Sequence, residues 1–180
     1  MKELFDLLLE NGIIIDSGLS DEEISIIESK YEISFPKSLK DFYKEGVPVS
    51  EGFINWRDFS KGNEEFIKDL IESTFSDVSE NAEEIYWNDE WGEEPEDTEE
   101  IAKIIKEKLK SAPKLIPIYS HRYMPMSVSD NPPIISVHEI DVIYYGKDLL
   151  DYFKIEFGNK KQSDIDFENI QKIPFWTEIM

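Results

Sequence analysis

Hydrophobic residues are densest between residues 114 and 157, where short apolar runs precede a helical pattern. The runs cover residues 115–119, 122–124, 134–137 and 142–145. They are rich in the β-branched and aromatic residues that favour half-buried strands. We expect three short strands in this stretch, with turns at residues 120–121 and 130–133. Gly146 then frees the backbone to leave the sheet.

Apolar residues recur at helical spacing after Gly146. Leu149, Leu150, Phe153 and Phe157 fall on one side of a helix, which predicts an amphipathic helix packed on the sheet. We expect Leu149 and Phe153 to be buried, because one helical turn separates them and the strands need a cover.

Helical patterns also fill the first part of the chain. Residues 2–11 predict a short helix that Gly12 ends. Ser20 and Glu23 predict a capping box at the start of a second helix, with a hydrophobic staple around it. Pro36 suits the first turn of a third helix, and glycine ten residues later is placed to stop it.

The middle of the chain and its tail are less regular. Residues 47–59 alternate turn residues with aromatic ones, which indicates an irregular strand held by aromatic burial. Asn63 is placed to cap a helix through Ser73 that buries Phe66, Ile67, Leu70 and Ile71, and residues 75–78 favour a short strand. Residues 97–111 predict a helix with acids early and lysines late, as its dipole favours. The C-terminal apolar residues are expected to be docked; they are Ile173, Phe175, Trp176 and Ile179.

Several motifs follow one another in a characteristic order. They are GLSDEEISIIESKYEISFPKSLKDFYKEGVPVSEGFINWRDFS, YWNDEWGEEPEDTEE, LIPIYSHRYMP, ISVHEIDVIYYGKDLLDYF and IPFW. This ordered series resembles the SUKH superfamily, whose bacterial members often serve as immunity proteins against polymorphic toxins. The resemblance implies tight binding to a cognate toxin domain, with its active site or an adjacent surface occluded. We expect an α+β fold in a single domain, residues 1–180, with a mostly antiparallel sheet of about five or six strands packed with helices.

Charge is the most informative bulk property. Asp and Glu number 40 against 19 Lys and Arg, so the formal net charge is 19 − 40 = −21. Such a field repels nucleic acid and anionic membranes and attracts basic proteins. The expected partner is therefore a basic toxin domain, with a nuclease as the obvious basic class. The alternative is that the acidity only keeps the protein soluble.

The negative charge is concentrated in one stretch. No basic residue occurs between Lys68 and Lys103. Large aromatic residues lie among the acids, as in a binding site for a basic protein. The alternative is that the two tryptophans are core residues and the acids a solvated rim. The candidate partner-binding residues are Tyr86, Trp87, Asp89, Glu90, Trp91, Glu93, Glu94, Glu96 and Asp97.

Candidate chemistry is sparse. The chain has no cysteine, which excludes a disulfide scaffold, a thiolate zinc site and a cysteine nucleophile. It also lacks a phosphate-binding glycine loop, a zinc-binding histidine pair and a nucleophile elbow. We expect no catalytic residue, no cofactor and no metal, and no binding to nucleic acid or membrane. With no signal peptide and no apolar span, the expected location is the cytoplasm.

Two alternatives to immunity belong to other functional classes. One is a regulatory adaptor for protein–protein interaction, as fungal members of the superfamily are thought to be in cell-wall synthesis. The other is a small-substrate enzyme that uses His121 and Arg122 at the turn between two strands. His138, Glu139 and Asp141 suggest a base with orienting carboxylates, but alternation along a strand predicts that the side chains of His138 and Asp141 diverge.

Overall fold

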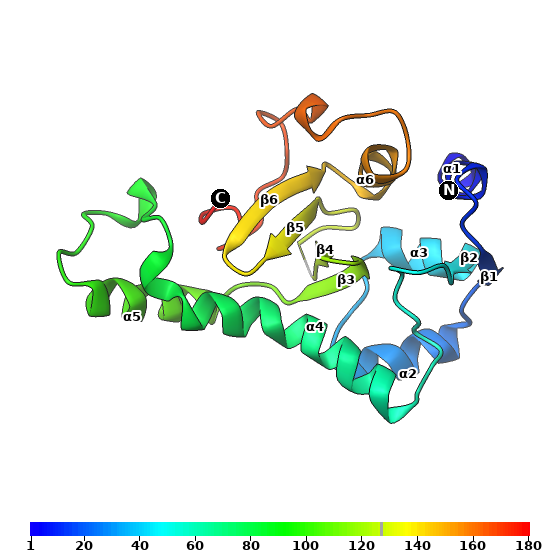
Figure 1. Ribbon diagram of the computed structural model, residues 1–180, viewed down its shortest axis with the longest axis horizontal. Helices are drawn as coiled ribbons and strands as arrows, with labels where there is room; N and C mark the ends of the chain where they lie inside the picture. The colour runs from blue at the N-terminus through cyan, green and yellow to red at the C-terminus, as the bar shows by residue number, and fades with distance from the viewer. Residues whose placement is uncertain (127) are drawn as a thin grey trace.

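The computed structural model describes residues 1–126 and 128–180, which fold into an α+β arrangement of six α-helices and six strands (Figure 1). The helices are α1 (Lys2–Glu10), α2 (Asp21–Tyr31), α3 (Lys37–Glu45), α4 (Lys61–Glu80), α5 (Thr98–Leu109) and α6 (Leu149–Glu156). The strands are β1 (Ile15–Ser17), β2 (Gly46–Pro48), β3 (Leu115–Tyr119), β4 (Arg122–Pro125), β5 (Ile134–His138) and β6 (Asp141–Gly146). The predicted α+β class is confirmed.

The central sheet has four antiparallel strands in the order β3-β4-β5-β6. The sequence predicted three strands from this stretch. The fourth arises because Glu139, at φ 56°, turns the chain between β5 and β6. The remaining two strands, β1 and β2, form a separate antiparallel pair. The six strands are therefore divided over two sheets.

The strands of the central sheet were predicted to be half-buried, but most of their residues are buried. All residues of β4, and all but the last of β3 and β5, are buried. Successive side chains point to opposite faces, so Ile116 and Ile134 join one apolar core while Leu115 and Ile135 join another. The continuous apolar runs reflect burial on both faces, which the prediction of half-buried strands missed.

The first core lies between the sheet and the helices α1, α2, α3 and α6. The capping box that begins α2 is confirmed, since Ser20 N–H donates to Glu23 Oε2 at 2.8 Å and Glu23 N–H donates to Ser20 Oγ at 3.1 Å. Pro36 is the N-cap of α3, one residue before the helix begins. Leu149 and Phe153 of α6 are buried as predicted, with exposed fractions of 3% and 0%.

The second core lies on the other face, between the sheet, the end of α4, α5 and the C-terminal tail. The four predicted tail residues are buried, which confirms that the tail is docked. Trp176 packs edge-on against Phe75 with ring centroids 5.4 Å apart, and its Nε1–H donates to the Pro113 carbonyl at 2.9 Å.

Helix α4 differs most from its prediction. It begins two residues earlier than Asn63 and continues through the expected strand at residues 75–78. Asn63 does not cap it: its side-chain amide donates to the carbonyls of Asn55 and Asp58. Phe66, predicted to be buried, is exposed. The helix can run on because its buried face passes from the first core at Ile71 to the second core at Val78.

Figure 1 shows α4 running along the β3 edge of the sheet, while α6 lies beside β6. Helices α1, α2 and α3 lie at the opposite end of the molecule from the loop that precedes α5. Among the described residues, none of the helices has the length and apolar character that a membrane crossing requires.

Candidate protein-binding site

Residues 83–100, here named the acidic segment, comprise most of the connection between α4 and α5 and the first three residues of α5, and the connection contains two short 3-10 turns. The second turn, Asp89–Trp91, is capped by Asn88, whose side-chain oxygen accepts a hydrogen bond from the Glu90 N–H at 2.8 Å. Gly92 follows at φ 98°, a left-handed conformation that favours glycine. The segment therefore has a defined backbone even though it is neither helix nor strand over most of its length.

The two tryptophans of the segment pack on each other. Their rings meet edge to face with centroids 5.3 Å apart, a preferred aromatic geometry. Trp87 Nε1–H donates to the Gly92 carbonyl at 2.9 Å. Both rings are half-buried against the second core. They are thus partly core residues, as one of the two sequence hypotheses held, and partly open to solvent.

The C-terminal tail holds this pair in place. Trp91 Nε1–H donates to Glu178 Oε2 at 2.7 Å, and the Asn88 amide donates to the Glu178 carbonyl at 2.8 Å. The other Glu178 carboxylate oxygen accepts from the Phe175 N–H at 3.0 Å. Lys108 of α5 places its ammonium 4.8 Å from the centre of the Trp91 ring, within the range of a cation–π contact.

Glu178 and Lys108 are residues of the site that sequence reasoning missed. Their roles depend on contacts between segments far apart in the chain, and no local motif marks them. A hydrogen-bonded glutamate in the tail, a lysine on α5 and two packed indoles together form what we name the tryptophan platform (Trp87, Trp91, Lys108 and Glu178).

The predicted carboxylates lie in the same stretch of chain as the platform tryptophans and are exposed to solvent. All six predicted acids are exposed: Asp89, Glu90, Glu93, Glu94, Glu96 and Asp97. Glu90 lies 3.5 Å from the ammonium of Lys172, in a pair that is itself exposed. Asp97 has a structural role as well, since its side chain caps α5 by accepting from the Glu99 N–H at 3.0 Å. Tyr86 is the most exposed large side chain nearby, at 89%.

Exposed carboxylates beside fixed aromatic rings suit a basic protein surface. The acids make the local electrostatic potential negative, which attracts lysine and arginine, and the rings offer apolar area that needs little further ordering. Because the platform is hydrogen-bonded in the free protein, binding there would cost less conformational entropy than binding to a flexible loop.

The histidine turn is arranged differently from its prediction. His138 and Asp141 are register partners across the β5–β6 turn, so their side chains share one face of the sheet and the predicted divergence is wrong. The alternation rule failed because it assumed a continuous strand through residues 138–141. His138 also packs on His121, with ring centroids 5.9 Å apart.

Arg122 is committed to contacts inside the protein. It is 9% exposed, donates to Ser136 Oγ at 2.9 Å and lies 3.8 Å from the centre of the Tyr145 ring. Its guanidinium also lies 3.4 Å from a carboxylate oxygen of Glu156. Burial lowers the pKa of His121, with further lowering from the charges of Arg122 and His138.

The acidic segment thus combines large aromatic side chains with exposed carboxylates, whereas the histidine turn presents a buried and already paired arginine. Within residues 1–126 and 128–180 there is no cluster of three or more histidine, aspartate or glutamate side chains that could hold a metal ion. Comparison of the chain with protein-family models, with curated proteins and with solved structures gives no match in any of the three.

Proposed function

We propose that this protein is a cytoplasmic immunity protein that binds and neutralises a cognate polymorphic toxin. The ordered motifs that resemble the SUKH superfamily support immunity as the function class. The observation that carries the proposed site is the combination, within one segment, of exposed carboxylates and two hydrogen-bonded tryptophans of the platform. The toxin domain that fits this surface is basic, and nucleases are a basic class because they must bind phosphates.

Neutralisation by this route needs binding alone. The acidic segment would steer a basic toxin by long-range attraction, which can raise association rates from roughly 10⁶ toward 10⁸ M⁻¹s⁻¹ at low salt. Short-range contacts with Tyr86 and the platform would then slow dissociation, since buried aromatic residues dominate binding energy in many interfaces. A standard interface covers about 800 Å² on each partner, enough to occlude an active site or the surface beside it.

The test compares two triple variants of equal charge. Glu93→Lys, Glu94→Lys and Glu96→Lys reverse three exposed acids of the segment, and Asp97 is left unchanged because it caps α5. The control reverses Glu10, Glu45 and Glu51, which are also exposed but lie near α1, α3 and β2 at the other end of the molecule.

Association with a basic toxin domain is measured by stopped flow at two salt concentrations. The segment variant should associate about tenfold more slowly at low salt and show a flatter salt dependence, because steering falls with screening. The association rate of the control variant should fall much less. Equal slowing of both variants would show that only net charge matters and would place the interface outside the acidic segment.

A further inference from the structure

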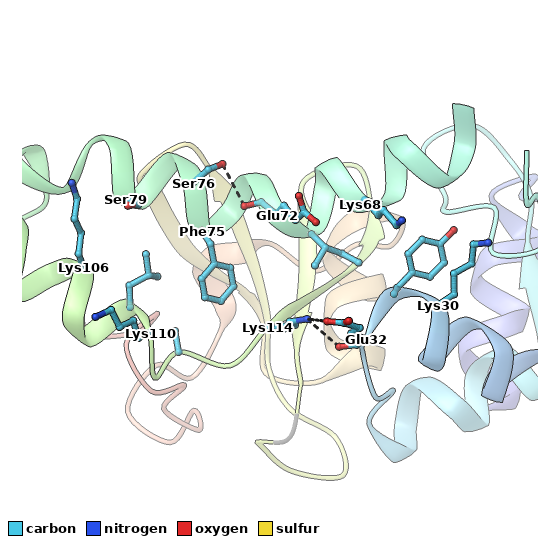
Figure 2. A pocket seen from close by; sticks show the side chains of 14 residues that line it. Lys30, Glu32, Lys68, Glu72, Phe75, Ser76, Ser79, Lys106, Lys110 and Lys114 are labelled. Atoms are coloured by element: carbon cyan, nitrogen blue, oxygen red, sulfur yellow. Dashed lines mark hydrogen bonds and ion pairs between the residues drawn. The ribbon is translucent and has the colours of Figure 1, made fainter. Parts of the chain in front are cut away.

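A groove of about 910 Å³ lies where the end of α2 meets α4, α5 and the residue before β3 (Figure 2). Its apolar lining includes Ile71 and Phe75 of α4, Leu109 at the end of α5, and Ala112 in the connection that follows. Ile71 belongs to the first core and Leu109 to the second. The groove therefore follows the junction of the two cores, where α4 passes from one to the other.

Lysines surround this apolar floor. The groove is lined by Lys30, Lys68, Lys106, Lys110 and Lys114. Figure 2 shows Lys106 and Lys110 at one end and Lys30 and Lys68 at the other, with Phe75 between them. Only two acids, Glu32 and Glu72, share the lining. This balance reverses that of the whole chain, in which acids outnumber bases by 40 to 19.

The lysines are only partly neutralised. Lys30 pairs with Glu64, Lys110 pairs with Glu107, and Lys114 lies 3.5 Å from a carboxylate oxygen of Glu32. Lys68 and Lys106 make no ion pair with any residue in the described part of the chain. Two ammonium groups, one toward each end, are thus available to an anionic ligand.

We propose that the groove binds an acidic peptide segment of a second protein. The groove has positive charge at both ends and an apolar floor between them. A complementary ligand is a peptide whose acidic residues flank large apolar side chains. The carboxylates would meet Lys68 and Lys106, and the apolar side chains would cover Phe75 and Leu109. The lining includes residues of α4 from Lys68 to Ser79, a length that suits an extended partner segment.

This site is distinct from the one proposed for the toxin. A basic toxin surface is attracted by the acidic segment and repelled by clustered lysines. The occupant of the groove is therefore a protein other than the basic toxin domain. The tests of the two sites are independent, because they use different ligands and different side chains.

The test is isothermal titration calorimetry of the full chain with the peptide Glu-Glu-Leu-Phe-Glu-Glu. The variant Lys68→Glu with Lys106→Glu reverses the two lysines that have no ion pair. The matched control, Lys61→Glu with Lys103→Glu, makes the same charge change at exposed positions of the same two helices, outside the groove. We expect the groove variant to weaken peptide binding about tenfold or more and the control to weaken it less than about threefold.

Further ligands separate this occupant from others. A peptide with serines in place of leucine and phenylalanine should bind more weakly, and equal binding would overturn the role of the apolar floor. If dodecanoate binds in a way that depends on the two lysines and the peptide does not bind, the groove is a small-molecule site and the proposal is wrong. Sedimentation velocity tests whether the chain binds a second copy of itself. If the chain self-associates and Lys68→Glu with Lys106→Glu abolishes this, a second copy is the occupant and the proposal is wrong.

Discussion

The two faces of the four-stranded sheet are covered by different parts of the chain. The first core is built from α1, α2, α3 and α6, with Trp56 packed among the aromatic rings of α2 and α3. The second core is built from the end of α4, α5 and the C-terminal tail, and the acidic segment rests on it. Among the described residues, the second core is the one that shares hydrogen bonds with the candidate binding site, and Glu178 makes this link.

Because of this difference, we expect mutations in the first core to change stability without changing binding. We expect mutations in the second core to change both. Damage to the first core should destabilise the protein while leaving the tryptophan platform intact in the molecules that remain folded. Damage to the second core should affect both properties, because the tail residues that fill it also position Trp91.

The largest effects are expected from truncating one large side chain in each core. Phe153→Ala and Trp176→Ala should each lower the free energy of unfolding by about 3 to 5 kcal/mol, because both side chains are fully buried. Urea melts measure the loss. A loss below about 0.5 kcal/mol for Phe153→Ala would mean that α6 is not packed on the sheet as described.

Milder changes at the same positions keep the protein folded for binding measurements. Phe153→Leu should leave the affinity for the toxin domain unchanged, whereas Trp176→Phe should weaken it, because the indole N–H bond to Pro113 helps to seat the tail. Equal effects of the two variants on affinity would remove the distinction between the faces.

A smaller effect is expected at the link between tail and platform. Glu178→Ala removes the acceptor of both the Trp91 and the Phe175 N–H groups, which should cost about 1 to 3 kcal/mol of stability. It should also speed dissociation of the toxin domain. Glu168→Ala is the control, because Glu168 is exposed and makes no side-chain hydrogen bond or ion pair with the described residues. Similar dissociation rates for both variants would show that Glu178 does not position the platform.

The salt bridge between Glu23 of α2 and Arg57 should give the stability a pH dependence that leaves toxin binding untouched. The Arg57 guanidinium, together with the Ser20 N–H, lowers the pKa of Glu23 from 4.5 to about 2. A carboxyl with a lowered folded-state pKa stabilises the fold fully above its unfolded pKa, and the stabilisation disappears as the pH falls toward 2. The stability difference between the wild type and Glu23→Gln should therefore be largest above pH 4.5.

The size of this difference is limited by solvent. The Glu23 side chain is 36% exposed, so the contribution should be about 1 kcal/mol. Urea melts from pH 7 downward measure it. A difference that grew as the pH fell would contradict the assignment of Glu23 as an ionised partner of Arg57.

The smallest effect is expected at the histidine turn. His121→Gln and His138→Gln should leave protection of toxin-expressing cells intact, because a stoichiometric binder needs no turnover. Circular dichroism checks that each variant is folded. Loss of protection with normal stability and normal toxin binding would require a catalytic account of the turn.

Much of the fold was predictable because its signals are local. The capping box of α2 involves residues three apart, and the α6 face repeats at three to four residues, so neighbouring positions in the sequence carry the whole pattern. The length of α4 was not predictable in this way. Its residues 75–78 become helical because the second core covers Val78, and that cover comes from distant segments.

The candidate site also has some features that local sequence predicts and others that it does not. Sequence by itself determined which carboxylates and aromatic residues lie together in the acidic segment, because they are neighbours in the chain. Tertiary structure alone decided that Glu178 binds Trp91 across 87 positions, that His138 faces Asp141, and that lysines from α2, α4 and α5 share one groove. These contacts depend on how packed elements bring distant residues together, and no local propensity or spacing encodes that arrangement.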